Sequence, residues 1–220
     1  MKLSKRLEMV ASLVEENKSV IDIGCDHALL SIFIALNKNS KKVIASDNKS
    51  GPLLHAKENV EKYKVLDKVK VKLGDGVDPI EEDIDTIIIS GMGGMNIVGI
   101  LKYKTDLFKN VDTIILSPNT DSDFVRREIC KLGFFIEEEK LVKDNKIIYP
   151  VIRFKKGKKH YKKVEYILGP ILIKRKEALF IEYLTNLRNT KSKILEILPK
   201  KYIFKKITLK KELKIINKIL

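Results

Sequence analysis

Short apolar runs rich in β-branched residues alternate with segments of helical spacing along the first 157 residues. This alternation is typical of βαβ units and predicts an α/β fold with a parallel sheet. Strands one to five are expected over 19–25, 42–47, 69–73, 84–90 and 112–117. Helices are expected over 3–14, 28–36, 52–63, 95–101 and 123–132. Pro52 would lie in the first turn of its helix, with Ser50 as the cap.

Two extended runs close this region and predict a hairpin. They cover 134–142 and 147–154, and the turn-prone residues 143–146 join them. A hairpin makes the last strand antiparallel to its neighbour. Five parallel strands closed in this way differ from the all-parallel sheet of nicotinamide-binding domains. They match the Rossmann-like, seven-stranded sheet of class I S-adenosylmethionine-dependent methyltransferases.

Beyond Gly157 the spacing becomes helical. Apolar residues recur at three- and four-residue intervals over 171–198, Pro199 interrupts them, and the pattern resumes over 207–220. Two helices that each bury one apolar stripe are expected to pair as a C-terminal, coiled-coil-like helical hairpin. We therefore predict two domains, 1–157 with the sheet and 158–220 with the hairpin.

Charge is distributed unevenly along the chain. Residues 1–150 hold 23 basic and 24 acidic side chains, a net charge of −1. Residues 151–220 hold 21 basic and 5 acidic side chains, a net charge of +16. An AT-rich genome would raise the lysine content for codon reasons, but codon drift does not explain why carboxylates become scarce at one end. Clustered cations of this kind are typical of nucleic-acid binding.

Length and composition exclude several classes of protein. At 220 residues and 44% hydrophobic content, the chain can form a core and is not a disordered polycation. No apolar run approaches the ~20 residues of a membrane span, and the charged beginning lacks a signal-peptide core. Cys25 and Cys130 cannot make a disulfide framework, and no His or Cys spacing resembles a metal site. We expect a cytoplasmic monomer with neither a metal nor a membrane partner.

The turn after the first strand has the sequence DIGCDHA (22–28), at the place of a nucleotide-binding loop. A dinucleotide fingerprint would need glycines at 24, 26 and 28, but Asp26 replaces the second of them. A carboxylate there repels a diphosphate and suits the ammonium and sulfonium groups of S-adenosylmethionine. A tight turn without a ligand is the competing interpretation.

The other strands also end in polar or glycine-rich turns. Asp47 ends the second strand, where such sheets hold ribose hydroxyls, although a turn or capping Asp is the alternative. The stretch 74–76 (GDG) follows the third strand and would meet an adenine edge or form a plain turn. The stretches 90–94 (SGMGG) and 117–119 (SPN) end the fourth and fifth strands. Five such turns at the carboxyl edge of one sheet predict a binding site.

Together these segments resemble the bacterial tRNA (adenine(22)-N1)-methyltransferase family. The resemblance rests on LSKRL (3–7), DIGCDHALL (22–30), LGDG (73–76), ISGMGG (89–94), SPN (117–119), KIIY (146–149), LGPIL (168–172) and the basic helical tail. The chain departs from the family pattern at Cys25, Asp47 and Ser117, where Ser, Glu and Gln are usual. The first two exchanges keep a small side chain and a carboxylate, whereas Ser117 bears on recognition of the base.

The resemblance implies transfer of a methyl group from S-adenosylmethionine to N1 of an adenine, position 22, in the D-arm of tRNA. The expected cofactor-binding residues are Asp22, Gly24, Cys25, Asp26, His27, Asp47, Asn48, Asp75, Gly76 and Gly91. The expected catalytic residues, which position the acceptor and stabilise the charge that the methylated ring gains, are Asp26, Gly91, Met92, Gly93 and Asn119. Adenine N1 already carries a lone pair, so no base is required, but the adenine must be exposed or flipped.

Other reactive side chains have simpler interpretations. His27 could act as a base, but a histidine that caps the following helix is the preferred interpretation. Cys25 could be a nucleophile, but methylation of adenine N1 needs no covalent enzyme adduct. Arg126 and Arg127 are expected on a solvated helix face, with tRNA contact as the alternative.

A basic run follows the last strand and is expected to contact tRNA phosphates. The expected RNA-binding residues are Arg6, Lys155, Lys156, Lys158, Lys159, Lys162, Lys163, Lys174 and Arg175. A solvated helix surface and an amphipathic contact with anionic lipid are the alternatives. The scarcity of Asp and Glu argues against the first, because surface helices normally carry both signs. The absence of Trp, and the need for the apolar stripe in helix pairing, argue against the second.

Three functions remain open from the sequence. The first is the tRNA adenine-N1 methyltransferase. The second is a methyltransferase of the same sheet that acts on another RNA site, a small molecule or a protein; with the last two acceptors it would not need a strongly basic tail. The third is a non-catalytic protein that binds RNA or a membrane surface, which would not need Asp47, Asp75 and GMGG (91–94) together.

Overall fold

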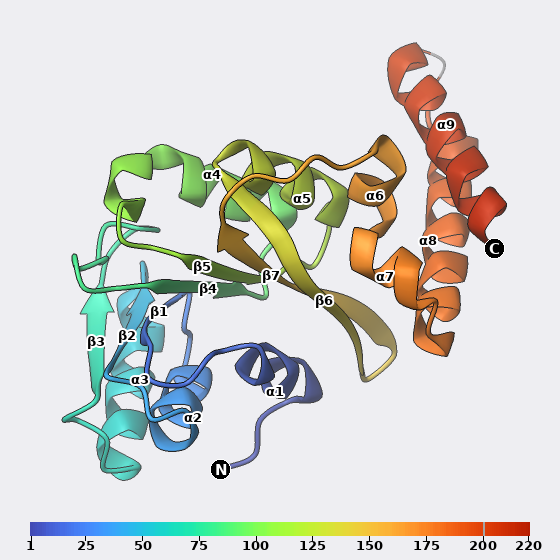
Figure 1. The fold of residues 1–220 in the computed structure, drawn as a ribbon. Coiled ribbons are helices and arrows are strands. Elements are labelled where there is room, and N and C mark those ends of the chain that lie inside the picture. The colour runs from blue at the N-terminus through green and yellow to red at the C-terminus, as the bar shows by residue number, and fades with distance from the viewer. Residues whose placement is uncertain (200) are drawn as a thin grey trace. The chain divides into compact units, whose positions relative to one another are not determined.

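The computed structural model describes residues 1–199 and 201–220. They form two compact units, unit 1 (1–159) and unit 2 (160–220) (Figure 1). The division lies two residues beyond the boundary expected after residue 157.

Unit 1 is built on a seven-stranded sheet with the strand order β3-β2-β1-β4-β5-β7-β6. The strands are β1 (Ser19–Ile23), β2 (Lys42–Asp47), β3 (Val69–Leu73), β4 (Thr86–Ser90), β5 (Thr113–Ser117), β6 (Phe134–Asp144) and β7 (Ile147–Lys156). The pairs among β1 to β5 are parallel, and β7 is antiparallel to both β5 and β6. The expected α/β class with a closing hairpin is thereby confirmed.

The strands at the centre of the sheet are apolar because both of their faces are covered. Every residue of β1 and β5 is buried, and Ile87, Ile88 and Ile89 of β4 have no exposed surface. The edge strand β3 is different, since it alternates valine with Lys70 and Lys72. Lysine on an edge strand discourages pairing with another chain.

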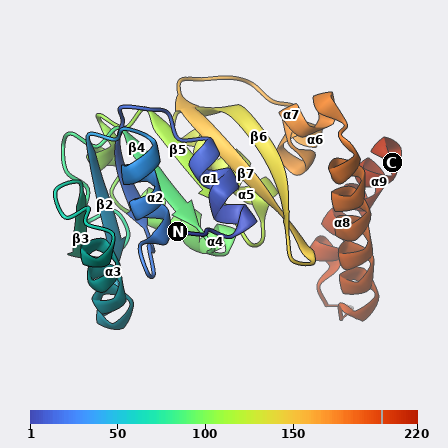
Figure 2. The same ribbon diagram turned by 90° about the horizontal axis from the view of Figure 1, so that it is seen from below.

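Five helices pack on this sheet in two layers. On one face lie α1 (Lys5–Ser12), α2 (Leu29–Asn37) and α3 (Ser50–Lys62), and on the other lie α4 (Gly94–Tyr103) and α5 (Ser122–Lys131) (Figures 1 and 2). A short 3-10 turn, η1 (Thr105–Phe108), follows α4. The expected cap of α3 is wrong: Ser50 is its first residue and Lys49 is the N-cap, although Pro52 lies in the first turn as expected.

Unit 2 contains helices and no strand among its described residues. Its helices are α6 (Lys163–Leu168), α7 (Pro170–Arg175), α8 (Ala178–Ile197) and α9 (Ile203–Ile219). The single helix expected over 171–198 is wrong, because Lys176 adopts a left-handed conformation (φ 49°) that ends α7. The hairpin itself is present: α8 packs along α9, and Lys191 Nζ lies 2.8 Å from Glu212 Oε2.

The topology of unit 1 sets the place of a site. β1 lies at the centre of the parallel strands: β2 and β3 follow it on one side, and the chain then crosses to place β4 and β5 on the other side. In open α/β sheets, ligands bind at this switch point, outside the carboxyl ends of the strands.

Candidate active site

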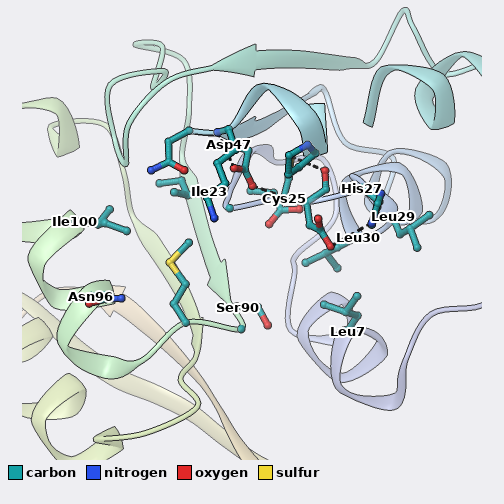
Figure 3. Close-up of a pocket in the computed structure, with 18 of the residues that line it drawn as sticks. Leu7, Ile23, Cys25, His27, Leu29, Leu30, Asp47, Ser90, Asn96 and Ile100 are labelled. Atoms are coloured by element: carbon teal, nitrogen blue, oxygen red, sulfur yellow. Dashed lines mark hydrogen bonds and ion pairs between the residues drawn. The ribbon is translucent and has the colours of Figure 1, made fainter. Parts of the chain in front are cut away.

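A cavity of about 960 Å³ opens at the carboxyl ends of β1, β2 and β4 (Figure 3). Its lining residues are Ser4, Arg6, Leu7, Asp22, Ile23, Gly24, Cys25, Asp26, His27, Leu29, Leu30, Asp47, Asn48, Lys49, Pro52, Gly74, Asp75, Gly76, Ser90, Gly91, Met92, Met95, Asn96, Gly99, Ile100, Asp144, Asn145 and Tyr149. Figure 3 shows Asp47 and Cys25 on one side of the cavity, and Asn96 and Ile100 of α4 across from them. Four of the five turns expected to form a site, those after β1, β2, β3 and β4, therefore line one cavity, whereas 117–119 do not line it.

The β1–α2 turn is bent back against β2. The backbone N–H groups of Gly24 and Cys25 both donate to the Ser46 carbonyl, at 2.8 and 2.9 Å. Gly24 has a φ of +75°, and a Cβ placed on it would lie 2.2 Å from the methyl carbon of Met92. The positive φ favours glycine at position 24, and any larger residue there would also have to displace the end of the Met92 side chain.

Asp22 is the buried acid of the site. It is 3% exposed, and its Oδ2 accepts a hydrogen bond of 2.7 Å from the Ser31 hydroxyl. Burial raises the pKa of Asp22 to about 6, and the nearby negative charge of Asp47 adds to the rise. Near neutral pH this carboxyl is therefore mostly ionised but close to its titration range.

Asp47 organises the end of β2. Its Oδ1 accepts from the Lys49 N–H at 3.0 Å, and its Oδ2 accepts from the Asp26 N–H at 3.3 Å. The side-chain amide of the adjacent Asn48 donates to Asp75 Oδ1 at 3.4 Å. The ends of β1, β2 and β3 are thus connected through side chains that were expected to bind the cofactor.

The lining of the cavity suits S-adenosylmethionine. It contains the carboxyl groups of Asp22, Asp26, Asp47 and Asp75, which favour a ligand with ammonium and sulfonium groups over a diphosphate. Asp47 contributes a carboxylate suited to paired hydroxyls, and the Gly74–Gly76 turn also lines the cavity. We regard this donor set as fitting the cofactor.

Arg6 of α1 reaches the carboxyl end of β5 on the opposite side of the cavity. Its Nε donates to Ser117 Oγ at 2.9 Å, its Nη1 donates to Asn119 Oδ1 at 2.7 Å, and its Nη2 donates to the Ser117 carbonyl. The guanidinium carbon lies 4.0 Å from the centre of the Tyr149 ring. One side chain therefore connects α1, β5 and β7.

Asn119 continues this connection to the glycine-rich turn after β4. Its side-chain amide donates to the Gly91 carbonyl at 2.6 Å, and its backbone N–H donates to the Met92 carbonyl at 2.8 Å. Both ends of the Asn119 amide are thus engaged, one with Arg6 and one with Gly91. Asn119 and Gly93 are not among the lining residues, so Asn119 contacts the lining residue Gly91 without lining the cavity itself.

Several lining residues were not expected from the sequence. Met95, Asn96, Gly99 and Ile100 share one face of α4, and this could have been found by extending a helix from the glycine-rich turn. Tyr149, Asp144 and Asn145 come from the β6–β7 hairpin. Nothing local in the sequence indicates that this hairpin meets α1 at the cavity.

The structure gives the environment of the four side chains whose roles the sequence left open, namely His27, Cys25, Arg126 and Arg127. His27 is not a helix cap, because the N-cap of α2 is Ala28; the His27 ring lies 5.2 Å from that of His55. Burial raises the pKa of the Cys25 thiol well above its usual range, so Cys25 is a poor nucleophile. Arg126 is not on a solvated face: it is fully buried, and its Nε donates to Glu139 Oε1 at 2.6 Å. Arg127 is half exposed, as expected.

The basic run at 155–175 includes residues of both units. Lys155 and Lys156 belong to β7 and have partners within unit 1: Lys155 Nζ lies 3.3 Å from Glu15, and Lys156 Nζ donates to the Lys109 carbonyl at 2.7 Å. Of the residues expected to bind RNA, Arg6 and Lys155 are partly buried, and the others are exposed, namely Lys156, Lys158, Lys159, Lys162, Lys163, Lys174 and Arg175.

Among residues 1–199 and 201–220, no helix is both long and apolar enough to cross a membrane. In the same ranges, no three His, Cys, Asp or Glu residues are grouped so that they could hold a metal ion.

Comparison with known proteins identifies the family. A family model described as a methyltransferase domain matches residues 3–152. The chain is 32% identical to the tRNA (adenine(22)-N(1))-methyltransferase of Bacillus subtilis over 200 residues, which cover 87% of this chain and 84% of that protein.

Solved structures agree with this match over nearly the full length. A Streptococcus pneumoniae protein in complex with S-adenosyl-L-methionine gives a TM-score of 0.90 at 29% identity, with 100% of both chains covered. TrmK of M. capricolum, in complex with S-adenosyl-homocysteine, gives a TM-score of 0.86 at 28% identity, covering 99% of this chain and 97% of that one. The chain therefore belongs to the tRNA (adenine(22)-N1)-methyltransferase family.

Proposed function

We propose that this protein transfers the methyl group of S-adenosylmethionine to N1 of adenine 22 in tRNA. The observation that carries the proposal is the cavity at the switch point. It joins a half rich in carboxyl groups, at the ends of β1, β2 and β3, to a half formed by Gly91, Arg6 and Tyr149. The reaction proposed for this two-part cavity is supported by the family match, since the B. subtilis relative is named for this activity.

The half rich in carboxyl groups is proposed to hold the cofactor. Asp47 accepts hydrogen bonds from the ribose hydroxyls, Asn48 and Asp75 with Gly76 flank the adenine ring, and Asp22 and Asp26 attract the ammonium group. Gly24, Cys25 and His27 form the wall between these acids. When bound, S-adenosylmethionine supplies an electrophilic methyl group on a sulfonium.

The other half is proposed to hold the acceptor adenine. The N1 lone pair of adenine is already free, so the residues of the chain orient the ring and exclude water rather than remove a proton. The Gly91 carbonyl and the Asp26 carboxylate provide negative potential for the charge that the ring gains. Met92 and Gly93 shape the turn, and Asn119 fixes the direction of the Gly91 carbonyl.

The exposed cations after β7 are proposed to bind tRNA phosphates. Lys158, Lys159, Lys162, Lys163, Lys174 and Arg175 have the exposure that such contacts need. Lys155, Lys156 and Arg6 are proposed to contribute less, because each already has a partner within unit 1. We also propose that the protein acts as a monomer, located in the cytoplasm with its tRNA substrate.

The direct test incubates the protein with methyl-labelled S-adenosylmethionine and unmodified tRNA, and then maps the labelled nucleoside. We expect N1-methyladenosine at position 22 and no label in a tRNA with guanine at that position. A methyl group on N6, equal labelling of the guanine variant, or transfer only to a small molecule would contradict the proposal.

A further inference from the structure

The tip of the α8–α9 hairpin exposes aromatic side chains among lysines. Phe204 is 87% exposed, Ile203 is 61% exposed, and Tyr202 is 47% exposed. At the end of α8, Ile197 is 80% exposed. Isolated apolar residues on a surface are ordinary, but four together at one turn call for an explanation.

Phe204 does not belong to the apolar stripe that holds the hairpin together. That stripe includes Leu209 and Ile216, which are 7% and 0% exposed and lie two turns apart on α9. Phe204 precedes Leu209 by five positions, so at 3.6 residues per turn it points about 140° away from it. Pairing of α8 with α9 therefore gives no reason for a phenylalanine at this position.

The backbone around the tip is held in place by its own hydrogen bonds. The N–H of Tyr202 donates to the Pro199 carbonyl at 3.1 Å, and the N–H of Lys206 donates to the Tyr202 carbonyl at 3.0 Å. The Thr208 hydroxyl donates to the Phe204 carbonyl at 3.0 Å. The rings are thus presented by the start of a helix, and little conformational freedom remains to be lost when they bind.

The charge around these rings has one sign. Residues 197–211 contain six lysines and no Asp or Glu. Lys201 Nζ lies 5.4 Å from the centre of the Tyr202 ring. Aromatic rings interleaved with cations fit single-stranded or unpaired nucleotides, because bases stack on the rings while the cations meet phosphates.

We propose that the hairpin tip, Ile197 and 201–206, is a second RNA contact, where Phe204 and Tyr202 stack on unpaired bases of the tRNA. This inference rests on the proposed function and extends it, since the tip lies outside the basic run at 155–175. It assigns to the rings a contribution to affinity that does not depend on salt, in addition to the salt-dependent contribution of the lysines.

The test measures binding of unmodified tRNA to full-length Phe204→Ala, Phe204→Leu and Phe204→Tyr by fluorescence anisotropy over a range of salt concentrations. Loss of the ring in the Ala and Leu variants should weaken binding roughly 5- to 100-fold at every salt concentration, leaving the slope of log affinity against log salt unchanged. Phe204→Tyr should bind like the unaltered protein. Since Phe204 is exposed, circular dichroism should show the same fold for all variants.

Ile181→Ala is the matched control. Ile181 is 41% exposed and lies on α8, 16 residues before Ile197, or about 24 Å along the helix. Its substitution should leave tRNA affinity unchanged. Equal weakening in this control and in Phe204→Ala would overturn the proposal, and so would unchanged affinity of Phe204→Ala.

Other partners for the tip give different results. If Phe204→Leu kept full affinity while Phe204→Ala did not, the tip would serve apolar burial rather than base stacking, and the proposal would be wrong. Loss of self-association, or of binding to phosphatidylserine vesicles, in Phe204→Ala with unchanged tRNA affinity would also overturn it. If the unaltered protein methylates adenine 22 and the Phe204→Ala variant binds tRNA normally, this inference is wrong while the proposed function stands. Failure of the unaltered protein to methylate tRNA would contradict the proposed function instead.

Discussion

The acids around the cavity differ in their surroundings, and this gives them different expected roles. Asp22 is buried beside Ser31, where its charge is costly, whereas Asp47 is partly exposed and accepts two backbone N–H groups. A carboxylate that accepts hydrogen bonds from backbone donors is held in one direction. Asp47 is therefore suited to a fixed polar contact, and Asp22 to a response to pH.

Asp47→Ala should remove the proposed ribose contact. Two hydrogen bonds to a charged group disappear, so affinity for S-adenosylmethionine should fall about 100-fold or more by isothermal calorimetry. Affinity for tRNA should remain. The control is Asp67→Ala, which removes an exposed carboxylate outside the cavity lining. Unchanged cofactor affinity in Asp47→Ala would refute this role.

Asp22 should make cofactor binding depend on pH. Because burial raises its pKa to about 6, the carboxyl gains a proton as the pH falls through 6, and affinity for a cationic cofactor should fall with it.

The free energy of unfolding of the free protein should change in the opposite direction, and rise as the pH falls. The unfolded carboxyl has a pKa of about 3.9, so between about pH 6 and 4 the folded state binds more protons and gains stability as the pH falls.

The variant Asp22→Asn isolates this effect. Calorimetry between pH 5 and 8 should show that the affinity of this variant for S-adenosylmethionine depends less on pH than that of the unaltered protein. A cofactor affinity that falls equally in both proteins would assign the titration to another group.

Arg6→Lys should disturb the acceptor side and leave the cofactor side intact. A lysine cannot bind Ser117 and Asn119 as a guanidinium fork does, so the Gly91 carbonyl loses its support. We expect kcat to fall roughly tenfold or more, because small misplacements of this kind are costly, with unchanged affinity for S-adenosylmethionine. Lys5→Ala, on the same helix, should leave kcat unchanged. A matching decrease in cofactor affinity in Arg6→Lys would show that Arg6 supports the whole fold instead.

At the scale of elements, the sheet was predictable because its strands are buried on both faces. β1, β4 and β5 appear in the sequence as apolar runs with polar turns after them, and the turns after β1 and β4 line the cavity. The helical tail was less predictable: the apolar spacing on α7 continues onto α8, so periodicity alone does not indicate the break at Lys176. The glycine-rich turn at Gly91 was expected from the sequence, but the contact of Arg6 with Ser117 could not be predicted, because the two residues are 111 positions apart.

The placement of Arg126 on a solvated helix face is the clearest error of the sequence interpretation. Arg126 belongs to a helix with a strongly polar sequence, yet it is fully buried against Glu139 of β6. Both charges lie in the same desolvated region, so each depends on the other.

Arg126→Met should therefore lower the free energy of unfolding by about 3–5 kcal/mol, because Glu139 would be left buried without its partner. Denaturant titration measures this decrease. Arg127→Met, whose side chain is 46% exposed, should change stability by less than about 1 kcal/mol. Similar values for the two variants would mean that the buried pair does not stabilise the attachment of α5.

At the scale of the whole molecule, most of the excess positive charge lies in unit 2, and a smaller part lies in unit 1. Unit 1 holds 28 basic and 24 acidic side chains, a net charge of +4, and unit 2 holds 16 and 5, a net charge of +11. Part of the basic run thus belongs to the sheet, where Lys155 is paired with Glu15. The unbalanced cations that remain are concentrated in unit 2. Our central claim is that unit 1 binds the cofactor and the cations beyond β7 supply the affinity for tRNA.

Replacing Lys158, Lys162, Lys163 and Lys174 by glutamine in the full chain tests this claim most directly. The control replaces four exposed lysines of unit 1, Lys41, Lys57, Lys64 and Lys70. We predict that the first variant binds tRNA at least tenfold more weakly, with a salt slope reduced by about 0.7–0.9 for each phosphate that the protein no longer neutralises. Its affinity for S-adenosylmethionine should match that of the unaltered protein. Unchanged tRNA affinity and salt slope, or an equal weakening in the control, would contradict the account.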